Sequence, residues 1–355
     1  MTSYKDSGVN IQAGNQASRA AYANAVKTFA SRKGKIGEVI EEEGGFAGLL
    51  DMGEYFLVQN DDGTGSKMEL AVAMNKFDTI GYDLLAMVAD DAVCIGAEVV
   101  SVSNTLDVPK ADPEMVDRLT AGLSKACLEQ GIVIPGGEVA EVPGAVNSPV
   151  WNATSIGIVA KDRVLKAESI SEGDAVISLK SEVMRSNGFS LVRKILSDKF
   201  GADWHTKEWK DGISWGEVML TPSIVYHSGV VKLLGRFGED RSVDVKAIAH
   251  ITGGGMADNL ARVLRKSGLG AKLDDLFEPH DAVKDLVELG KVEVDEAYKT
   301  WNMGNGMMVI VDVKDAKNTI EILKSEGIES KKSGVVTKDP NIEISTYTGQ
   351  KIQTQ

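Results

Sequence analysis

The sequence predicts an α/β fold of the mixed (α+β) kind in two domains, and three observations support this. Short β-branched segments alternate along the chain with amphipathic segments of helical period. With 355 residues, the chain exceeds the roughly 100 to 200 residues that one domain usually holds. Hydrophobic residues make up 43% and charged residues 26%, values that exclude disordered, collagenous and disulfide-stapled classes.

The first half of the chain reads as a polar tail followed by alternating helices and strands. Helices are expected at residues 16–33, 79–95 and 113–130, and strands at 55–59, 97–102, 131–134 and 156–159. Periodicity does not give strand direction, so a parallel sheet is only one possibility.

A polar segment at residues 161–173 predicts the boundary between the domains. The expected N-terminal domain covers residues 1–165 and the C-terminal domain 170–350. The second half contains expected strands at 175–179, 245–251 and 307–313, and expected helices at 190–197, 223–234 and 316–326.

The net charge and the cysteine content limit which partners and which kinds of metal or disulfide site the chain can have. A formal net charge of -13 without a Lys or Arg cluster makes nucleic acid and membrane surfaces poor partners. Only Cys94 and Cys127 are present, without CxxC spacing, so neither a zinc site nor a disulfide framework is expected. The sequence shows neither a leader pattern nor an apolar run of roughly 18 residues, so a cytoplasmic location is expected.

The segment 79–95 carries the most informative acidic residues. Asp83 and Asp90 are seven residues apart and lie on nearly the same helix face, with Asp91 beside them. Because the rest of this helix is apolar, the carboxylates need cations, which Mg²⁺ or lysines from elsewhere would supply. The alternative is a solvated polar stripe.

Two Gly-rich acidic segments are further candidates. The first, expected to be a loop, contains two carboxylates, two glycines, a hydroxyl and a lysine: Asp61, Asp62, Gly63, Gly65, Ser66 and Lys67. Such a loop can approach phosphate closely, hold Mg²⁺ and neutralise a phosphoryl group, although it could equally be an ordinary hairpin turn. The second contains Gly136, Gly137 and Glu138 after an expected strand, and could be only a wide turn.

In the second half, His250 and the glycines Gly253, Gly254 and Gly255 lead from an apolar strand into a helix, where backbone amides bind anions. The glycines could instead serve strand-to-helix packing. Another candidate anion clamp precedes the helix at 190–197 and consists of Arg185, Ser186, Asn187 and Gly188. Its alternative is helix capping.

Taken together, these motifs resemble the phosphoribosylformylglycinamidine cyclo-ligase family over nearly the whole chain. The matching segments occur in the family's order: 4–9, 13–15, 44–49, 62–67, 78–84, 96–98, 136–138, 186–194, 221–222, 250–255 and 302–307.

The resemblance implies an ATP-dependent ligase. ATP phosphorylates the formamide oxygen of formylglycinamidine ribonucleotide, an amidine nitrogen attacks the activated carbon, and phosphate leaves as aminoimidazole ribonucleotide forms in purine biosynthesis. It also implies two α/β domains, an N-terminal mixed sheet that forms a barrel with a second copy in a homodimer, and a C-terminal sheet flanked by helices.

The resemblance also distributes roles among residues. Lys67, Asp83 and His250 would be catalytic. ATP would contact Lys5, Asp6, Gly63, Gly65, Ser66, Asp78, Gly136 and Gly137. Mg²⁺ would bind to Asp62, Asp83, Asp90, Asp91 and Glu138. The small-molecule ribonucleotide would contact Arg185, Ser186, Asn187, Gly253, Gly254 and Gly255.

Departures from the family pattern leave the exact substrate open. The chain has Asp61, Asp90, Asn104 and Arg185 where the family has threonine, asparagine, aspartate and histidine. It also has Val99 in place of proline and Val139 in place of threonine.

Other functions fit parts of the same pattern. The nearest is another ATP-using enzyme of the same superfamily, such as a thiamine monophosphate kinase-like phosphotransferase. Selenophosphate synthetase would need a reactive Cys in its N-terminal loop, which this sequence lacks. A dinucleotide-dependent oxidoreductase fails the fingerprint, because Asp258 stands at its third glycine. A nucleotide-binding protein without catalysis is a further alternative.

Overall fold

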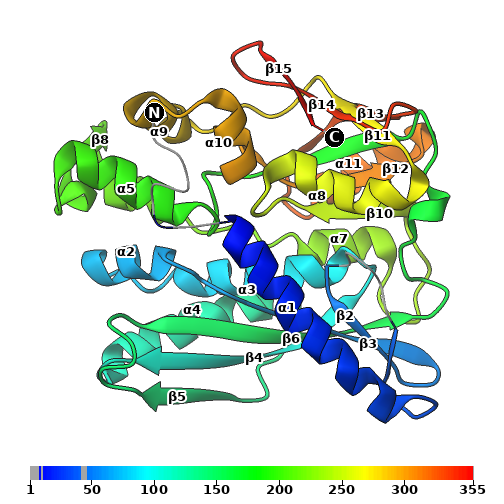
Figure 1. Ribbon diagram of the computed structural model, residues 1–355, viewed down its shortest axis with the longest axis horizontal. Helices are drawn as coiled ribbons and strands as arrows, with labels where there is room; N and C mark the ends of the chain where they lie inside the picture. The colour runs from blue at the N-terminus through cyan, green and yellow to red at the C-terminus, as the bar shows by residue number, and fades with distance from the viewer. Residues whose placement is uncertain (1–7, 9–10, 41–45, 355) are drawn as a thin grey trace.

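Two mixed β-sheets with their helices organise the chain and confirm the predicted fold class (Figure 1). The computed structural model describes residues 8, 11–40 and 46–354. The first sheet ends at Ala160 and the second begins at Ala175, while the exact domain limits stay a prediction.

The first sheet has six strands, and the described residues of this part of the chain also form four α-helices. Its strands, in spatial order, are β1 (Glu38–Ile40), β2 (Gly48–Asp51), β3 (Tyr55–Gly63), β6 (Val150–Ala160), β4 (Glu98–Val108) and β5 (Gly137–Glu141). Among the strand pairs of the described residues in this sheet, β4 and β5 are parallel and the others antiparallel. The helices of this part are α1 (Ile11–Phe29), α2 (Lys67–Met74), α3 (Ile80–Val93) and α4 (Pro113–Gln130).

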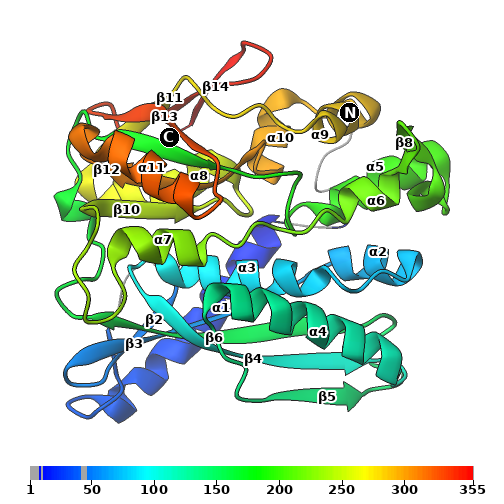
Figure 2. The same ribbon diagram turned by 180° about the vertical axis from the view of Figure 1, so that it is seen from behind.

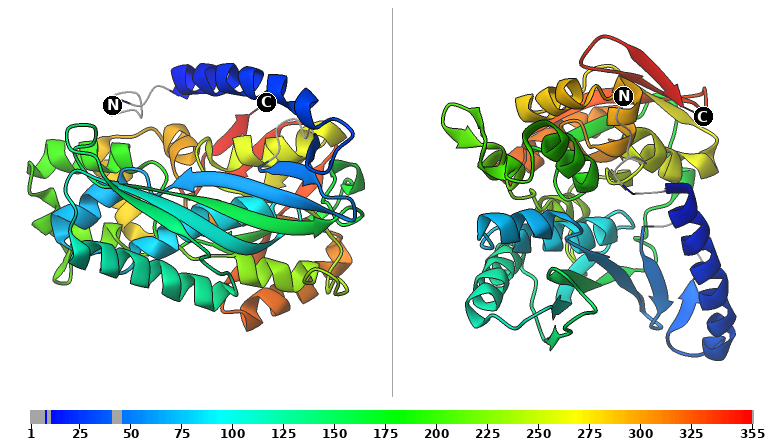
Figure 3. Two further views of the ribbon diagram at one scale, coloured as in Figure 1. Left: turned by 90° about the horizontal axis from the view of Figure 1, so that it is seen from below. Right: turned by 60° about the vertical axis from the view of Figure 1, so that its left-hand side comes forward.

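Side-chain alternation gives this sheet two different faces. In β6, Trp151, Ala153 and Ser155 are buried, whereas Val150 and Asn152 are exposed, because successive strand residues point to opposite sides. Helices α3 and α4 cover the buried side. Seen from the other side, in the left panel of Figure 3, strands β3, β6 and β4 lie in front of those helices.

The second sheet has seven strands. In spatial order they are β10 (Val245–His250), β12 (Asn305–Val311), β7 (Ala175–Lys180), β13 (Ser330–Thr337), β11 (Gly270–Leu273), β14 (Ile342–Ser345) and β15 (Lys351–Thr354). Its helices are α5 (Phe189–Phe200), α6 (Trp215–Met219), α7 (His227–Leu234), α8 (Gly255–Leu264), α9 (Asp281–Gly290), α10 (Val294–Thr300) and α11 (Ala316–Ser325). A small hairpin of β8 (Glu208–Lys210) and β9 (Ile213–Ser214) precedes α6.

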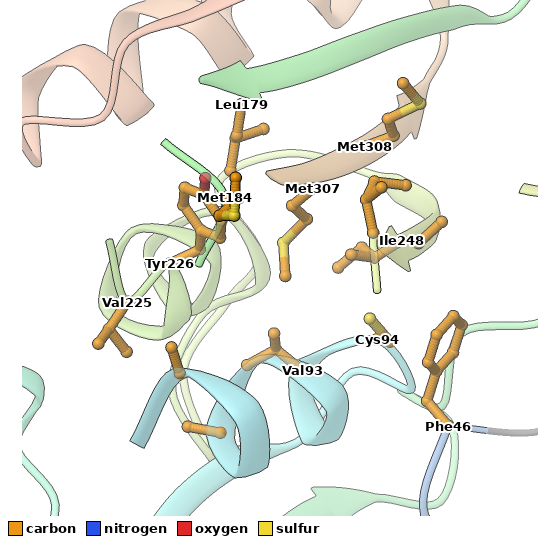
Figure 4. Packing of buried hydrophobic residues seen from close by; sticks show 14 of the residues in the cluster. Phe46, Val93, Cys94, Leu179, Met184, Val225, Tyr226, Ile248, Met307 and Met308 are labelled. Carbon is orange, nitrogen blue, oxygen red and sulfur yellow. The ribbon is translucent and has the colours of Figure 1, made fainter. Parts of the chain in front are cut away.

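One apolar core continues from the first part into the second. Figure 4 shows Val93 and Cys94, at the end of α3, facing Met307 of β12 and Ile248 of β10. All four side chains are buried. Helix α3 therefore lies between the two sheets, with α7 beside it (Figure 2).

Several expected elements were wrong in extent. Strand β3 continues to Gly63, so Asp61 and Asp62 lie on a strand rather than in a loop. Residues 131–134 make only an isolated bridge through Val133, and the expected loop at Glu138 is the edge strand β5. The helix expected from residue 223 begins at His227, because the residues before it bond to α3 instead.

Candidate active site

Several of the predicted site residues meet where α3 faces the second part of the chain. Asp83, Asp90 and Asp91 all lie on α3, and each contacts a residue from the second part. Predicted residues from distant parts of the sequence are thus brought together at one junction.

Asp83 forms a buried ion pair with Lys67. The Lys67 Nζ atom lies 2.8 Å from Asp83 Oδ1 and 2.7 Å from the carbonyl oxygen of Thr221, and both charged side chains are 0% exposed. Ser223 donates its backbone N–H to the same Asp83 oxygen over 3.2 Å. Burial lowers the pKa of Lys67, and the Asp83 carboxylate opposes that shift.

Asp90 is paired in the same manner with Arg185. The Arg185 Nη2 atom lies 2.5 Å from Asp90 Oδ2, and the backbone N–H of Tyr226 donates to Asp90 Oδ1 over 3.0 Å. Burial raises the pKa of Asp90, and the Arg185 charge opposes this. Two of the carboxylates on the acidic helix are therefore neutralised by the chain itself: Asp83 by Lys67 and Asp90 by Arg185.

Asp91 and Asp62 differ from these two carboxylates. Asp91 Oδ1 lies 2.7 Å from His250 Nδ1, and its Oδ2 accepts a long hydrogen bond of 3.4 Å from Asn60. Burial raises the pKa of Asp62 to about 6; the backbone N–H of Gly63 opposes the shift and the Asp91 charge adds to it. In the described part of the chain, neither Asp62 nor Asp91 has a Lys or Arg within ion-pair distance.

This donor set fits a hard divalent cation that keeps water or phosphate ligands. Within the described residues, no group of three or more His, Cys, Asp or Glu side chains is arranged to hold a metal. Mg²⁺ is commonly bound by one or two carboxylates together with substrate phosphates. Asp62 and Asp91 are the carboxylates of this cluster that have no Lys or Arg partner among the described residues, so they are the candidates for such a site.

The glycine segment after β3 makes a tight turn into α2. Gly65 has a positive φ of 56°, which glycine adopts without strain. The Ser66 hydroxyl lies 3.3 Å from that of Ser190 at the start of α5. The turn thus touches the second part of the chain.

A polar groove crosses the first sheet beside this turn. In register, Asp62 stands opposite Ala153, Ala153 opposite Asn104, and Asn104 opposite Gly137. Three strand spacings, about 14 Å, therefore separate Asp62 from Gly137. The groove has a volume of about 360 Å³ and is lined by Asp61, Asp62, Gly63, Ser103, Asn104, Thr105, Asn152, Ala153 and Thr154.

Other predicted nucleotide ligands lie apart from this cluster. Gly136, Gly137 and Glu138 are exposed at the edge of the first sheet. Asp78 is held by Arg118 on the surface over 2.9 Å, and its pKa is lowered by that bond. Lys5 and Asp6 lie outside the described residues.

The predicted anion clamps occupy two helix starts. Helix α5 begins after Gly188, with Asn187 half-buried and the Ser186 hydroxyl 3.5 Å from Asp83 Oδ1. Helix α8 begins at Gly255, after an exposed Gly253 and a Gly254 with φ of 92°. The first backbone N–H groups of a helix have no partner within the helix, although that of Gly255 donates to the Thr252 carbonyl oxygen over 3.0 Å.

The resemblance included Thr221 and Pro222, but the residues after them were predicted as the start of a helix rather than as part of the segment that joins the two parts. Thr221 and Tyr226 bond to Lys67 and Asp90 through backbone atoms, so their side-chain types carry little signal, whereas Ser223 bonds to Asp83 through both its backbone N–H and its hydroxyl. Pro222 was the one local signal, because the residue before a proline prefers extended backbone over helix.

The fold and the site define a class of two-domain proteins. The family model described as AIR synthase related protein, N-terminal domain, matches residues 44–159, and the model for the C-terminal domain of the same proteins matches residues 171–346. A solved structure of hydrogenase maturation protein HypE in complex with ATP shares the fold, with a TM-score of 0.59 and 18% identity over 84% of each chain.

Full-length relatives identify the family more closely. Phosphoribosylformylglycinamidine cyclo-ligase of Pyrococcus furiosus is 36% identical over 98% of both chains. The protein of the same name from Clostridium kluyveri is 35% identical over 92% of this chain and 94% of its own length. The chain belongs to the phosphoribosylformylglycinamidine cyclo-ligase family.

Proposed function

We propose that this protein is an ATP-dependent ligase that forms a C–N bond, converting formylglycinamidine ribonucleotide to aminoimidazole ribonucleotide, ADP and phosphate. The observation that carries the proposal is 36% identity across 98% of both chains with a relative of that name. ATP phosphorylates the amide oxygen, an amidine nitrogen attacks the carbon, and phosphate leaves. The reaction belongs to purine biosynthesis, and we place it in the cytoplasm. The structure contains, among the described residues, no helix long and apolar enough to cross a membrane.

Asp62 and Asp91 are the residues we propose for Mg²⁺. Neither has a Lys or Arg partner within the part of the chain that the structure describes, whereas Asp83 pairs with Lys67 and Asp90 with Arg185. A bound Mg²⁺ would supply positive charge to the triphosphate. The carboxylate of Glu138 is exposed and three strands away, and its register with Thr105 and Asn152 places it on the opposite face of the sheet from Asp62, so we do not assign Glu138 to the same metal ion.

Lys67 and Asp83 support the nucleotide side of the site. Lys67 is the first residue of α2 and follows the Gly63–Ser66 turn directly. Two of its three N–H groups are taken by Asp83 and Thr221, so we assign it the task of holding this turn against the second part of the chain. Backbone amides of the turn, with Gly63, Gly65 and Ser66, then face phosphate oxygens.

The ribonucleotide would lie against the starts of α5 and α8. Ser186, Asn187 and the glycines Gly253, Gly254 and Gly255 place backbone amides at these termini, where the helix dipole favours a phosphate. Arg185 is 4% exposed and already bonded to Asp90, so a direct substrate contact through its guanidinium would require local opening.

We further propose that a second copy of the chain covers the open face of the first sheet. Val150 is exposed on this face, beside the groove residues Asn152 and Thr105. Sedimentation equilibrium should then give twice the chain mass of 37.9 kDa. A monomer at micromolar concentration would contradict the shared barrel.

The test of the reaction is direct. Purified protein with formylglycinamidine ribonucleotide, ATP and Mg²⁺ should form aminoimidazole product and ADP in equal amounts. Omission of the ribonucleotide should stop ADP formation, because phosphoryl transfer needs the amide oxygen as acceptor. ADP formed at an unchanged rate without the ribonucleotide would contradict a cyclo-ligase.

The proposed metal carboxylates allow a matched pair of variants. Asp62→Asn removes one charge from the half-buried carboxylates Asp62 and Asp91, and we expect the Mg²⁺ concentration for half-maximal turnover to rise roughly 10- to 100-fold. Asp61→Asn changes the neighbouring carboxylate, which bonds to Thr154 and points to the other face of β3, and should raise that concentration much less. Equal effects in the two variants would contradict the assignment.

A further inference from the structure

Arg185 connects the second part of the chain to the carboxylate that we assign to the metal. Its Nη1 atom lies 2.6 Å from His250 Nε2, and His250 Nδ1 lies 2.7 Å from Asp91 Oδ1. The three side chains come from the segment after β7, from the end of β10 and from α3. They form one continuous line of hydrogen bonds across the junction.

The direction of these hydrogen bonds follows from the chemistry of the groups. A guanidinium has five N–H donors and no acceptor, so His250 Nε2 must carry the lone pair and accept from Arg185. The imidazole proton then resides on Nδ1 and is donated to Asp91. His250 is 0% exposed, so both of its ring nitrogens are engaged inside the protein.

Arg185 is itself held on several sides. Its Nη2 atom donates to Asp90 Oδ2 over 2.5 Å and to the carbonyl oxygen of Ile224 over 3.2 Å. The guanidinium carbon lies 5.0 Å from the centre of the Tyr226 ring. The backbone of Arg185 adopts a positive φ of 57°, which is uncommon for a residue with a side chain. Such strain persists only where the surroundings hold it in place.

We infer that Arg185 is a positioning residue: through the Nδ1-protonated ring of His250 it orients the Asp91 carboxylate beside Asp62. His250 is then a positioning residue too, rather than a proton donor or acceptor for the substrate. Second-layer hydrogen bonds of this kind fix the tautomer and direction of groups that bind a metal. The link to turnover rests on the proposed function, whereas the tautomer of His250 does not.

The experiment uses the full chain labelled with ¹⁵N-histidine, without nucleotide or metal, at pH 7.5. Two-bond ¹⁵N–¹H correlations report which ring nitrogen carries the proton, and His250→Asn assigns the signal among the four histidines. His280, whose Nδ1 accepts from the backbone N–H of Ala282, serves as the internal reference for the opposite tautomer. We expect His250 to carry its proton on Nδ1 alone. A proton on Nε2 would overturn the inference.

Variants then test whether the contact matters for the reaction. Arg185→Met combined with Asp90→Asn removes the donor without leaving a buried unpaired charge, and the asparagine oxygen can still accept from Tyr226 N–H. We expect His250 ring signals to broaden or split and kcat to fall roughly 10- to 100-fold. Native His250 signals with native kcat in a folded double variant would overturn the role.

Arg185→Lys is the conservative comparison, because lysine keeps both a donor and the charge opposite Asp90. It should keep the Nδ1-protonated signal and turn over faster than the double variant. If the lysine variant keeps that signal but loses as much kcat as the double variant, Arg185 does not act through His250. If the wild-type protein makes no aminoimidazole product at all, the proposed function fails, while the His250 signal still decides the placement of the proton.

Discussion

Lys67→Met should destabilise the protein by about 3–5 kcal/mol, because removal of one partner leaves the other charge of a buried pair uncompensated. Lys67 and Asp83 are both 0% exposed, and the remaining donors to Asp83, from Ser223 and Ser186, are neutral. Urea unfolding followed by circular dichroism measures the change. Lys351→Met is the matched control, because its pair with Glu343 is solvent-exposed and such pairs contribute roughly 0–1 kcal/mol.

A second variant separates folding from function. Lys67→Met combined with Asp83→Asn removes both charges, and the asparagine side chain that replaces Asp83 can still accept from the Ser223 N–H. We expect most of the stability to return but turnover to stay low, because the turn before α2 loses its bond to the Thr221 carbonyl. Full recovery of turnover would mean that the bond from Lys67 to the Thr221 carbonyl is not needed for the reaction.

Acid should weaken the protein through His227, by up to about 5 kcal/mol between pH 6.5 and pH 3. His227 Nε2 accepts the backbone N–H of Val99 over 2.9 Å, which joins α7 to β4, and its Nδ1 has no hydrogen-bond partner among the described residues. Burial lowers the pKa of His227 from 6.5 to about 3, and Arg236 adds to the shift. Since the unfolded chain binds this proton first, the stabilisation is present above pH 6.5 and is lost as the pH falls.

The measurement compares wild type with His227→Gln in urea at pH 7.5 and pH 4.5. Glutamine can accept from the Val99 N–H but takes up no proton, so the wild type should lose about 3 kcal/mol more than the variant between these two pH values. Carboxylates that titrate in the same range, Asp62 among them, affect both proteins alike. Parallel losses in the two proteins would show that His227 does not titrate as its burial requires.

Much of the fold followed from periodicity. Helix α4 begins at Pro113 and ends at Gln130 as expected, because Asp112 caps its start and Gly131 ends it in the left-handed conformation. Such local signals act over a few residues and can be read directly. Strand β5 and the extended segment before His227 could not be read in this way, since both depend on partners far along the chain.

The carboxylates of α3 also show that a local sequence pattern cannot identify partners far along the chain. Periodicity placed Asp83 and Asp90 on one face of a buried helix and required cations for them. It could not distinguish a metal ion from Lys67 or Arg185, because Arg185 lies 95 residues from Asp90 in sequence. The sequence also predicted a catalytic role for His250. In the structure, both ring nitrogens of His250 are already bonded, one to Arg185 and the other to Asp91.

The sequence by itself determined the class of fold, the family and the carboxylates of α3, because these depend on local pattern and on an ordered series of motifs. Only the tertiary structure decided which carboxylates already have a cation, and therefore which two we propose for a metal. That division depends on the packing of α3 against residues 221–226, Arg185 and His250. Long-range contacts there neutralise Asp83 and Asp90, while Asp62 and Asp91 have no Lys or Arg partner among the residues that the structure describes.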